Sequence, residues 1–398
     1  MPDLHVVRPL QVVLAGGGVA AVEAALALRD LAGELVEATV VAPNEYLAYR
    51  PMSVREPFGY ASAQHYPLSE IASDLGMHLI CEKVARVNTR ARIVHTQEGT
   101  ELEYGALLVA LGAATRLRYE HALTIDDAHL AQTLQGLLTD VEQGRVRRLV
   151  FVIPGRLAWP FPAYELALMM QTRAEKAGAE LSTAIISPEK RPLGLFGLEV
   201  SRKISRLLAE RQIEFISAAG CEVPDPKRVV LMPSHRQLEA DRVVSLPTLH
   251  GHALTGVPKT PRGFIPIDPH CQVRGVERIY AAGDGTDFEL KHGGIASQQA
   301  DAAAEAIAAL AGAPIRPAPF RPVVRGVLLT GRKPLFLSAC YSGGHGFSAK
   351  MTDRATWSPP TKISAKYLGP YLDRIDRIVG VHGGPRQPAG AATDEPAG

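Results

Sequence analysis

The residues best suited to do chemistry form a glycine-rich turn near the N-terminus. The segment GGGVAA at residues 16–21 fits the pattern G-x-G-x-x-A, follows a short apolar run and opens an alanine-rich stretch. In that pattern Gly16 permits a tight turn, Gly18 lets a pyrophosphate approach bare backbone, and Ala21 allows close packing of helix on strand. The N–H groups and the dipole of the helix then attract the anion. The turn predicts a dinucleotide site, with a purely structural turn as the alternative.

One residue expected of such a site is missing. An Asp or Glu normally follows the second strand and holds the adenosine ribose. In this sequence that position is Ala42, and Pro43, Asn44 and Glu45 follow it. We expect Asn44 or Glu45 to take this role from a shifted loop.

The other residue types that could carry chemistry are scattered along the chain. The cysteines form no C-x-x-C pair, and the thirteen histidines show no H-x-x-x-H or other ligand spacing. This distribution predicts neither a local redox disulfide nor a metal site. It also favours mostly reduced thiols and a cytoplasmic location.

The glycine turn needs a strand before it and a helix after it, and the sequence predicts both. Residues 11–15 are an apolar strand, residues 19–31 a helix and residues 38–42 a second strand. Residues 107–111 read as another buried strand. This alternation predicts an α/β fold with a parallel, doubly wound sheet.

The same rhythm starts again about 135 residues later. We expect a strand at 149–153, a helix at 163–177, a strand at 182–186 and an amphipathic helix at 199–211. A late strand at 278–282 and a helix at 295–311 follow. Two such units predict two Rossmann-like lobes.

The predicted domains follow from these units. Residues 1–118 and 262–314 form a discontinuous first domain that holds the glycine turn, and residues 119–261 form a second domain of the same type. Residues 315–378 lack the βα rhythm and form a small C-terminal region; residues 379–398 are rich in Gly, Pro and Ala and are expected to be disordered.

Composition excludes several classes of function. With 46% hydrophobic and 21% charged residues the chain is an ordinary globular one, and its net charge of +2 gives no reason to expect nucleic acid. The apolar runs are far shorter than the ~20 residues that a membrane span needs. The first residues contain no apolar core before a small-residue cleavage site, so we do not expect export. We expect a cytoplasmic protein, with peripheral attachment to the inner face of the membrane left open.

Four stretches together resemble a known group of flavoproteins. They are VVLAGGGVAAVEAALAL, YLAYRPM, LLVALGA and RIYAAGDGTDFELKHGGIASQQADAAAEAI, spread over residues 12–307. The chain resembles the FAD-dependent pyridine nucleotide-disulfide oxidoreductase superfamily. Within it, the likeness is to sulfide:quinone oxidoreductase, flavocytochrome c sulfide dehydrogenase and type II NADH dehydrogenase. The resemblance implies an FAD cofactor and oxidoreductase activity. It also implies that residues 1–118 and 262–314 are the FAD-binding domain and that residues 119–261 are the second, NAD(P)-type domain.

Carried over position by position, the resemblance implies roles along the whole flavin. The first turn would line the pyrophosphate, Val84 would contact adenine, and Asp284 would bind the ribityl hydroxyls. Residues 291–295 would face the pyrimidine end, where backbone N–H groups or Lys291 could stabilise negative charge on the reduced flavin. The residues implied to contact the cofactor are Gly16, Gly18, Val19, Ala20, Ala21, Asn44, Arg50, Pro51, Val84, Ala110, Gly112, Gly283, Asp284, Lys291, Gly294 and Ile295.

Two of these residues have plain structural alternatives. Asp284 could serve only as a helix cap or turn residue, which is a common use of Asp. Lys291 could equally be a solvated surface lysine.

The second lobe departs from its relatives in the loop where a nicotinamide cofactor would bind. That site normally shows G-x-G-x-x-G, whereas residues 154–162 read PGRLAWPFP, with one glycine, three prolines and a tryptophan. This stiff, bulky loop argues against the usual binding of NADH. It resembles the loop of the sulfide-oxidising branch, in which a cysteine precedes a proline-rich turn. Trp159 stands where we would look for that cysteine, so the two-cysteine sulfide chemistry is expected to be lost.

The candidate catalytic residues are Glu165, Lys291 and Cys340. Glu165, at the start of its helix, would carry protons near the flavin or simply complement the helix dipole. Cys340 resembles the second cysteine of the sulfide dehydrogenases, but without a partner a buried small hydrophobe is the alternative. Trp159, Phe161 and Tyr164 would wall the pocket over the flavin or pack between the lobes.

The C-terminal stretch 363–378 predicts an amphipathic helix. Ile363, Tyr367, Tyr371 and Ile375 recur at helical spacing beside basic residues. In the quinone-reducing relatives this region contributes to the quinone pocket and to membrane attachment. We expect a helix packed on the protein or at a homodimer contact rather than one in a membrane.

Three functions remain open on the sequence alone. The leading one is a sulfide:quinone oxidoreductase-like enzyme that passes electrons from a small donor through FAD to a quinone or similar acceptor, without the cysteine pair. The second is an NAD(P)H-dependent flavin or quinone reductase with a divergent nicotinamide site. The third is a flavin-binding scaffold or sensor with little turnover.

Overall fold

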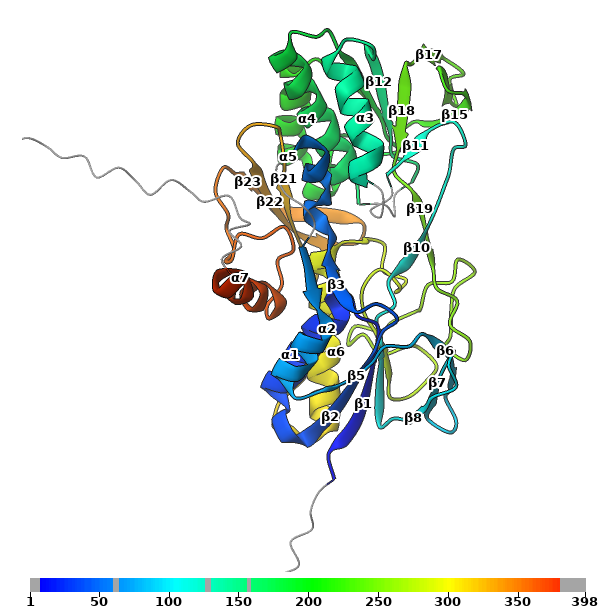
Figure 1. Cartoon of the computed structure of the whole chain (residues 1–398), viewed down its shortest axis with the longest axis vertical. Coiled ribbons are helices and arrows are strands. Elements are labelled where there is room, and N and C mark those ends of the chain that lie inside the picture. The colour runs from blue at the N-terminus through cyan, green and yellow to red at the C-terminus, as the bar shows by residue number, and fades with distance from the viewer. Residues whose placement is uncertain (1–7, 60–63, 126–129, 156–158, 380–398) are drawn as a thin grey trace, which may run out of the picture.

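The computed structural model describes residues 8–59, 64–125, 130–155 and 159–379 of the 398. Two parallel sheets organise these residues, one in each half of the elongated molecule (Figure 1). The predicted α/β class, with two Rossmann-like units, is confirmed.

The first sheet is built from the predicted strands and one more. Its order is β20-β9-β1-β2-β5, and every neighbouring pair is parallel. β9 is buried along its whole length and β1 from Val12 to Ala15, as expected for a parallel sheet covered by helices. Its strands are β1 (Leu10–Ala15), β2 (Val36–Val41), β5 (His78–Ile80), β9 (Ala106–Val109) and β20 (Ile279–Ala281).

Three helices pack beside this sheet in the lower half of Figure 1. They are α1 (Val19–Leu31), α2 (Leu68–Leu75) and α6 (Gly293–Leu310). α1 and α6 are rich in alanine and bury most of it, so small side chains let the two helices approach each other closely. This packing places the N-termini of α1 and α6 at the carboxyl ends of β1 and β20, because each helix follows its strand.

The second sheet repeats the arrangement with the order β11-β18-β12-β13-β14, again all parallel. Its strands are β11 (Leu123–Thr124), β12 (Arg148–Val152), β13 (Ser182–Ile186), β14 (Ile213–Ile216) and β18 (Arg242–Ser245). The helices in this half are α3 (Leu130–Glu142), α4 (Phe161–Ala177) and α5 (Leu198–Glu210). Two antiparallel strands, β10 (Ala113–Arg116) and β19 (Thr248–Gly251), run between the two halves.

Short antiparallel elements complete these two halves. The strands are β3 (Tyr46–Tyr49), β4 (Gln64–Pro67), β6 (Val84–Asn88), β7 (Ile93–Thr96), β8 (Glu101–Glu103), β15 (Gly220–Asp225), β16 (Arg228–Met232) and β17 (Gln237–Glu239). The 3-10 helices are η1 (Gly33–Leu35), η2 (Arg50–Phe58) and η3 (Gly194–Phe196).

The C-terminal region does not continue the alternation of strands and helices, as the sequence predicts. It forms an antiparallel sheet of β21 (Val323–Leu328), β22 (Leu335–Ser342) and β23 (His345–Thr352), followed by α7 (Leu368–Val379). The helix predicted from residue 363 begins only at Leu368, so the prediction is wrong for its first five residues. They form bends and irregular backbone, because their N–H groups bind other parts of the protein. No helix among the described residues is long and apolar enough to cross a bilayer.

Candidate functional site

The turn between β1 and α1 is held tightly by the ends of neighbouring strands. Gly16 has φ +133°, and a Cβ on it would lie 2.3 Å from the carbonyl oxygen of Ala110. The Gly16 N–H donates to the carbonyl of Val41 at 2.8 Å, and the Ala110 N–H donates to that of Ala15 at 2.8 Å. Only glycine fits this position, since both the backbone conformation and the close contact exclude a side chain.

The start of α1 is open. Gly18 is the N-cap, makes no side-chain cap hydrogen bond, and has no atom within 4 Å of where a Cβ would stand. No acidic residue lies in the first turn. The N–H groups of a first turn have no acceptors within the helix, so they are suited to an anion. An open, uncapped helix end at the carboxyl edge of a parallel sheet fits the pyrophosphate of FAD.

Two further glycine segments meet this turn. A Cβ on Gly283, which has φ +87°, would lie 3.4 Å from Cβ of Ala20 in the first turn of α1. A Cβ on Gly285 would lie 2.9 Å from the carbonyl oxygen of Gly112. The predicted segments 16–21, 110–112 and 283–285 are therefore neighbours in space.

Other residues assigned to the cofactor lie at different depths. Asn44 is exposed in the bend after β2, whereas Val84 is buried at the start of β6. Ala42 is fully buried and donates its N–H to the carbonyl of Ile80 at 3.0 Å. The side chains of Arg50 and Pro51 lie outside the described residues.

Lys291 is buried, which excludes the alternative of a solvated lysine. Its ammonium donates to the carbonyl of Thr286 and lies 4.1 Å from the centre of the Phe264 ring. Burial lowers the pKa of Lys291 to about 8, against the opposing effect of Asp284 and Asp287. A lysine with this pKa can exist in either protonation state near neutral pH.

The N-terminus of α6 is capped by a residue that the sequence analysis missed. His292 is buried, and its Nδ1 accepts the N–H of Gly294 at 3.2 Å. The N–H of Ile295 binds the carbonyl of His292 at 2.9 Å. Two of the backbone donors assigned to the flavin are thus used within the protein. Burial lowers the pKa of His292 to about 4, so the imidazole is neutral. His292 directly precedes Gly293 and the alanine-rich helix, and this position in the sequence could have identified it as the N-cap.

An aromatic cluster lies against this helix end. The ring of Trp159 is 4.2 Å from that of His292 and stacks on Phe161 at 4.5 Å. A Cβ on Gly326, in β21, would lie 2.6 Å from the Phe161 ring and 3.3 Å from the Trp159 ring. The aromatic side chains therefore cover the start of α4, where a nicotinamide cofactor would need bare backbone.

Tyr164 does not join this cluster. It is fully buried, its hydroxyl donates to Glu189 at 2.9 Å, and the same hydroxyl accepts the N–H of Leu193 at 3.2 Å. Tyr164 is a core residue of the second half, so the expectation that it walls the flavin pocket is replaced by the packing alternative.

Glu165 forms a buried ion pair. Its carboxylate lies 2.8 Å from the ammonium of Lys362 and accepts the N–H of Leu329 at 2.9 Å. Glu165 is 1% exposed and the Lys362 side chain 10%. Burial raises the pKa of Glu165 and lowers that of Lys362, while each charge opposes the shift of the other. Complementing the helix dipole is therefore not the main interaction of Glu165.

The cysteines are all free thiols. Cys340 is half-buried on β22, opposite Val323 and Phe347. Cys271 is fully buried, and burial raises its pKa. Within the described part of the chain, no group of three His, Cys, Asp or Glu side chains could hold a metal ion.

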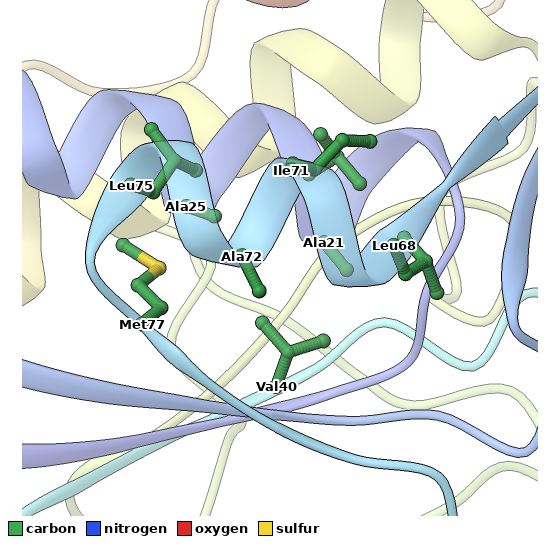
Figure 2. A pocket seen from close by; sticks show the side chains of 9 residues that line it. Ala21, Ala25, Val40, Leu68, Ile71, Ala72, Leu75 and Met77 are labelled. Atoms are coloured by element: carbon green, nitrogen blue, oxygen red, sulfur yellow. The ribbon is translucent and has the colours of Figure 1, made fainter.

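A small apolar pocket lies between α1, α2 and β2 (Figure 2). Its lining includes Ala21, Val40, Leu68, Ile71 and Met77, all without polar side-chain groups. Such a lining suits neither phosphate nor a reacting group. In Figure 2 the methyl group of Ala21 faces this space, so Ala21 serves helix packing.

Comparisons with known proteins agree with this geometry. Residues 10–305 match the family described as pyridine nucleotide-disulphide oxidoreductase. Sulfide-quinone reductase of Aquifex aeolicus is 26% identical over 254 residues, which are 60% of this chain and 59% of that protein. Human apoptosis-inducing factor 3 is 26% identical over 226 residues, 54% of this chain and 35% of that protein. The chain thus spans about three fifths or less of these curated relatives.

Solved structures show the same fold at low identity. The sulfide:quinone oxidoreductase of Aquifex aeolicus superposes with a TM-score of 0.78 at 22% identity, covering 94% of this chain and 92% of that one. A ferredoxin reductase from Rhodopseudomonas palustris gives a TM-score of 0.63 at 19% identity, covering 83% and 82%. Since the family match extends over most of the described chain, the protein belongs to the pyridine nucleotide-disulphide oxidoreductase family, whose members bind FAD.

Proposed function

We propose that this protein is an FAD-dependent oxidoreductase that passes electrons from a small donor to a quinone or similar acceptor without a redox cysteine pair. One contrast supports the proposal most. The start of α1 is open and uncapped, whereas the start of α4 is covered by Trp159 and Phe161. The first helix end suits a dinucleotide, and the second does not.

Bound FAD would accept two electrons and pass them on. The chain would hold it by the residues that the sequence assigned, above all Gly16, Gly18, Ala110, Gly112 and Asp284. The N–H groups at the start of α1 would bind the pyrophosphate. The buried ammonium of Lys291 would stabilise negative charge.

The residues around Trp159 support a reaction without thiol chemistry. Trp159 occupies the position where the resemblance places a cysteine, and an indole cannot act as a redox thiol. Glu165 and Lys362 would hold a proton between them and move it to or from a substrate. Cys340 would then be a structural residue. We also propose that the domain boundaries lie where the sequence analysis places them, after residues 118, 261 and 314.

Association with a membrane surface and formation of a homodimer are further predictions. The burial of Leu368 and Leu372 of α7 favours a helix packed on the protein over one in a membrane. A cytoplasmic location remains a proposal, which the scattered cysteines support.

Anaerobic titration of the purified yellow protein tests the proposal. The flavin absorbance is followed while sulfide, NADH and NADPH are added separately, and a soluble quinone analogue is then added to the reduced protein. We expect slow or no bleaching by either nicotinamide nucleotide and rapid reoxidation by the quinone.

Rapid bleaching by NADH or NADPH, with a charge-transfer band, would establish the nicotinamide-dependent reductase instead. A flavin that no donor reduces, in a protein that binds a partner tightly, would support the scaffold. A colourless protein that takes up no FAD would overturn the flavin assignment itself.

A further inference from the structure

A buried carboxylate on α1 binds the beginning of the C-terminal helix. Glu23 is fully buried, and its two oxygens accept three consecutive backbone N–H groups. The donors are Lys366 at 2.8 Å, Tyr367 at 3.0 Å and Leu368, the first residue of α7. An ionised carboxylate at a helix N-terminus satisfies donors that the helix cannot, and it also faces the positive end of the dipole.

A second carboxyl group lies beside Glu23. Asp301, on α6, is hydrogen-bonded to Glu23, and burial together with the charge of Glu23 raises the pKa of Asp301 to about 8. The two carboxyl groups therefore titrate as a pair, and the three N–H groups favour the negative charge on Glu23. Burial raises the pKa of Glu23 too, but the three N–H groups oppose that shift. Glu305 on α6 and Lys366 are the other charged groups facing Asp301.

The segment before α7 is fixed at two more points. Lys362 pairs with Glu165 at 2.8 Å, and the N–H of Ile363 donates to the hydroxyl of Tyr49 at 3.0 Å. Residues 361–368 are hereafter called the strap. They connect α1, β3 and α4, elements that belong to both halves of the molecule.

The strap covers the N-terminus of α6. A Cβ on Gly293 would lie 2.7 Å from the side chain of Ile363, and one on Gly294 would lie 3.5 Å from the carbonyl of Ser364. This helix end is the place where the resemblance puts the pyrimidine end of the flavin. A ligand bound at this helix end would therefore lie beside the strap.

We propose that Glu23 is a buried pin that fixes the strap over the N-terminus of α6 and thereby retains the bound dinucleotide. The pinning rests on the contacts of Glu23 alone. The retention of the dinucleotide rests in addition on the proposed function. Glu23 is a positioning residue, because it acts through the strap and touches no reacting atom.

Hydrogen–deuterium exchange of the full-length protein tests the pin. Glu23→Gln keeps the size of the side chain but removes the charge and turns one acceptor into a donor. We expect exchange at residues 366–368 to become at least about ten-fold faster, and trypsin to cleave sooner after Lys362 and Lys366. The matched control is Asp30→Asn, which removes another α1 carboxylate that binds the strap only through the Tyr367 hydroxyl. It should leave exchange within about two-fold of wild type.

Glu23→Asp provides a second variant should the amide fail to fold. It keeps the charge but shortens the side chain, so its exchange at residues 366–368 should lie between those of Glu23→Gln and the wild type. Wild-type exchange in whichever variant folds would overturn the pin.

Release of FAD on dilution tests the retention separately. We expect the folded Glu23 variant to lose FAD several-fold faster than both wild type and Asp30→Asn. Fast exchange with unchanged FAD release would show that the strap does not retain the dinucleotide. The claim that Glu23 fixes the strap would still hold. If no form of the protein binds FAD, the proposed function fails, while the exchange experiment still decides about the pin.

Discussion

The carboxylate of Glu165 and the ammonium of Lys362 lie 2.8 Å apart in the protein interior, 197 residues apart in the chain. The pair ties α4 of the second half to the strap that covers α6 of the first. Charge inside a protein is tolerated only where its partner stays in place, so the two side chains depend on each other.

Removing one partner of this pair should destabilise the protein strongly. Lys362→Met leaves Glu165 as an uncompensated buried charge, and we expect a loss of about 3–5 kcal/mol in the free energy of unfolding. The double variant Glu165→Gln with Lys362→Met should recover much of it. Urea denaturation measures both. Lys203→Met, which breaks the exposed pair with Glu199, should leave the free energy of unfolding almost unchanged, because water screens that pair. Equal losses at the two sites would contradict the prediction.

The two glycines of the first turn should separate folding from cofactor binding. Gly16→Ala drives a Cβ into the carbonyl of Ala110 and forces a strained φ, so we expect a loss of more than about 2 kcal/mol in stability. Gly18→Leu meets open space and should cost only about 1 kcal/mol, because leucine is a poorer N-cap than glycine. It should nevertheless abolish the yellow colour, because the side chain fills the pyrophosphate position. A Gly18→Leu protein that keeps its flavin would contradict the assignment.

The buried ammonium of Lys291 should lower the free energy of unfolding at neutral pH. Its pKa is about 8 in the folded protein and 10.5 without burial, so the unfolded chain binds more protons between these values. The contribution of Lys291 to the free energy of unfolding therefore rises with pH between about 8 and 10.5. Below pH 8 the buried charge destabilises the folded protein by its full amount. Lys291→Met should raise the free energy of unfolding at pH 7 by on the order of 1 kcal/mol and flatten the rise between pH 8 and 10. Lys259→Met, on the surface, should do neither.

The same substitution should shift the flavin potential. If the ammonium of Lys291 stabilises negative charge on the reduced cofactor, Lys291→Met lowers the midpoint potential by on the order of 30 mV. Spectroelectrochemical titration at pH 7 measures the shift. An unchanged potential would mean that Lys291 is only a structural contact to Thr286 and Phe264.

Asp301 should make stability fall as the pH rises. Its pKa is about 8 in the folded protein and 3.8 without burial, so between these values the folded state holds a proton that the unfolded state has lost. Stability from this group is highest below pH 3.8 and falls until pH 8. Asp301→Asn keeps a donor to Glu23 and cannot ionise. We expect its advantage over wild type to grow by about 1–3 kcal/mol from pH 5 to pH 8 in thermal or urea denaturation. Asp353→Asn, at an exposed site, should show no such growth.

Local patterns in the sequence predicted the regular elements well. The helix at residues 19–31 and the strand at 182–186 have the same bounds in the structure. α4 begins at Phe161, two residues before the predicted start, because Pro162 is compatible with the first turn of a helix. In each case neighbouring residues determine the outcome, so no knowledge of distant contacts is needed.

Local patterns could not predict hydrogen bonds and ion pairs between residues that lie far apart in the sequence. The start of α7 was predicted five residues too early, because the N–H groups of the strap bind Glu23 and the hydroxyl of Tyr49 rather than continuing a helix. The partner of Glu165 and the coupling between the carboxyl groups of Glu23 and Asp301 arise only where separate segments of the chain pack together. Helical spacing predicts which face is buried, but it does not say which charge lies opposite.

The contact between Gly326 and the aromatic rings constrains how this protein can be redesigned. The missing side chain on β21 makes the room that Phe161 and Trp159 occupy. Grafting a nicotinamide fingerprint into residues 154–162 would remove those rings and leave a void beside Gly326. Residue 326 would have to be replaced by a larger residue at the same time. Substitutions in the loop and in β21 must therefore be made together.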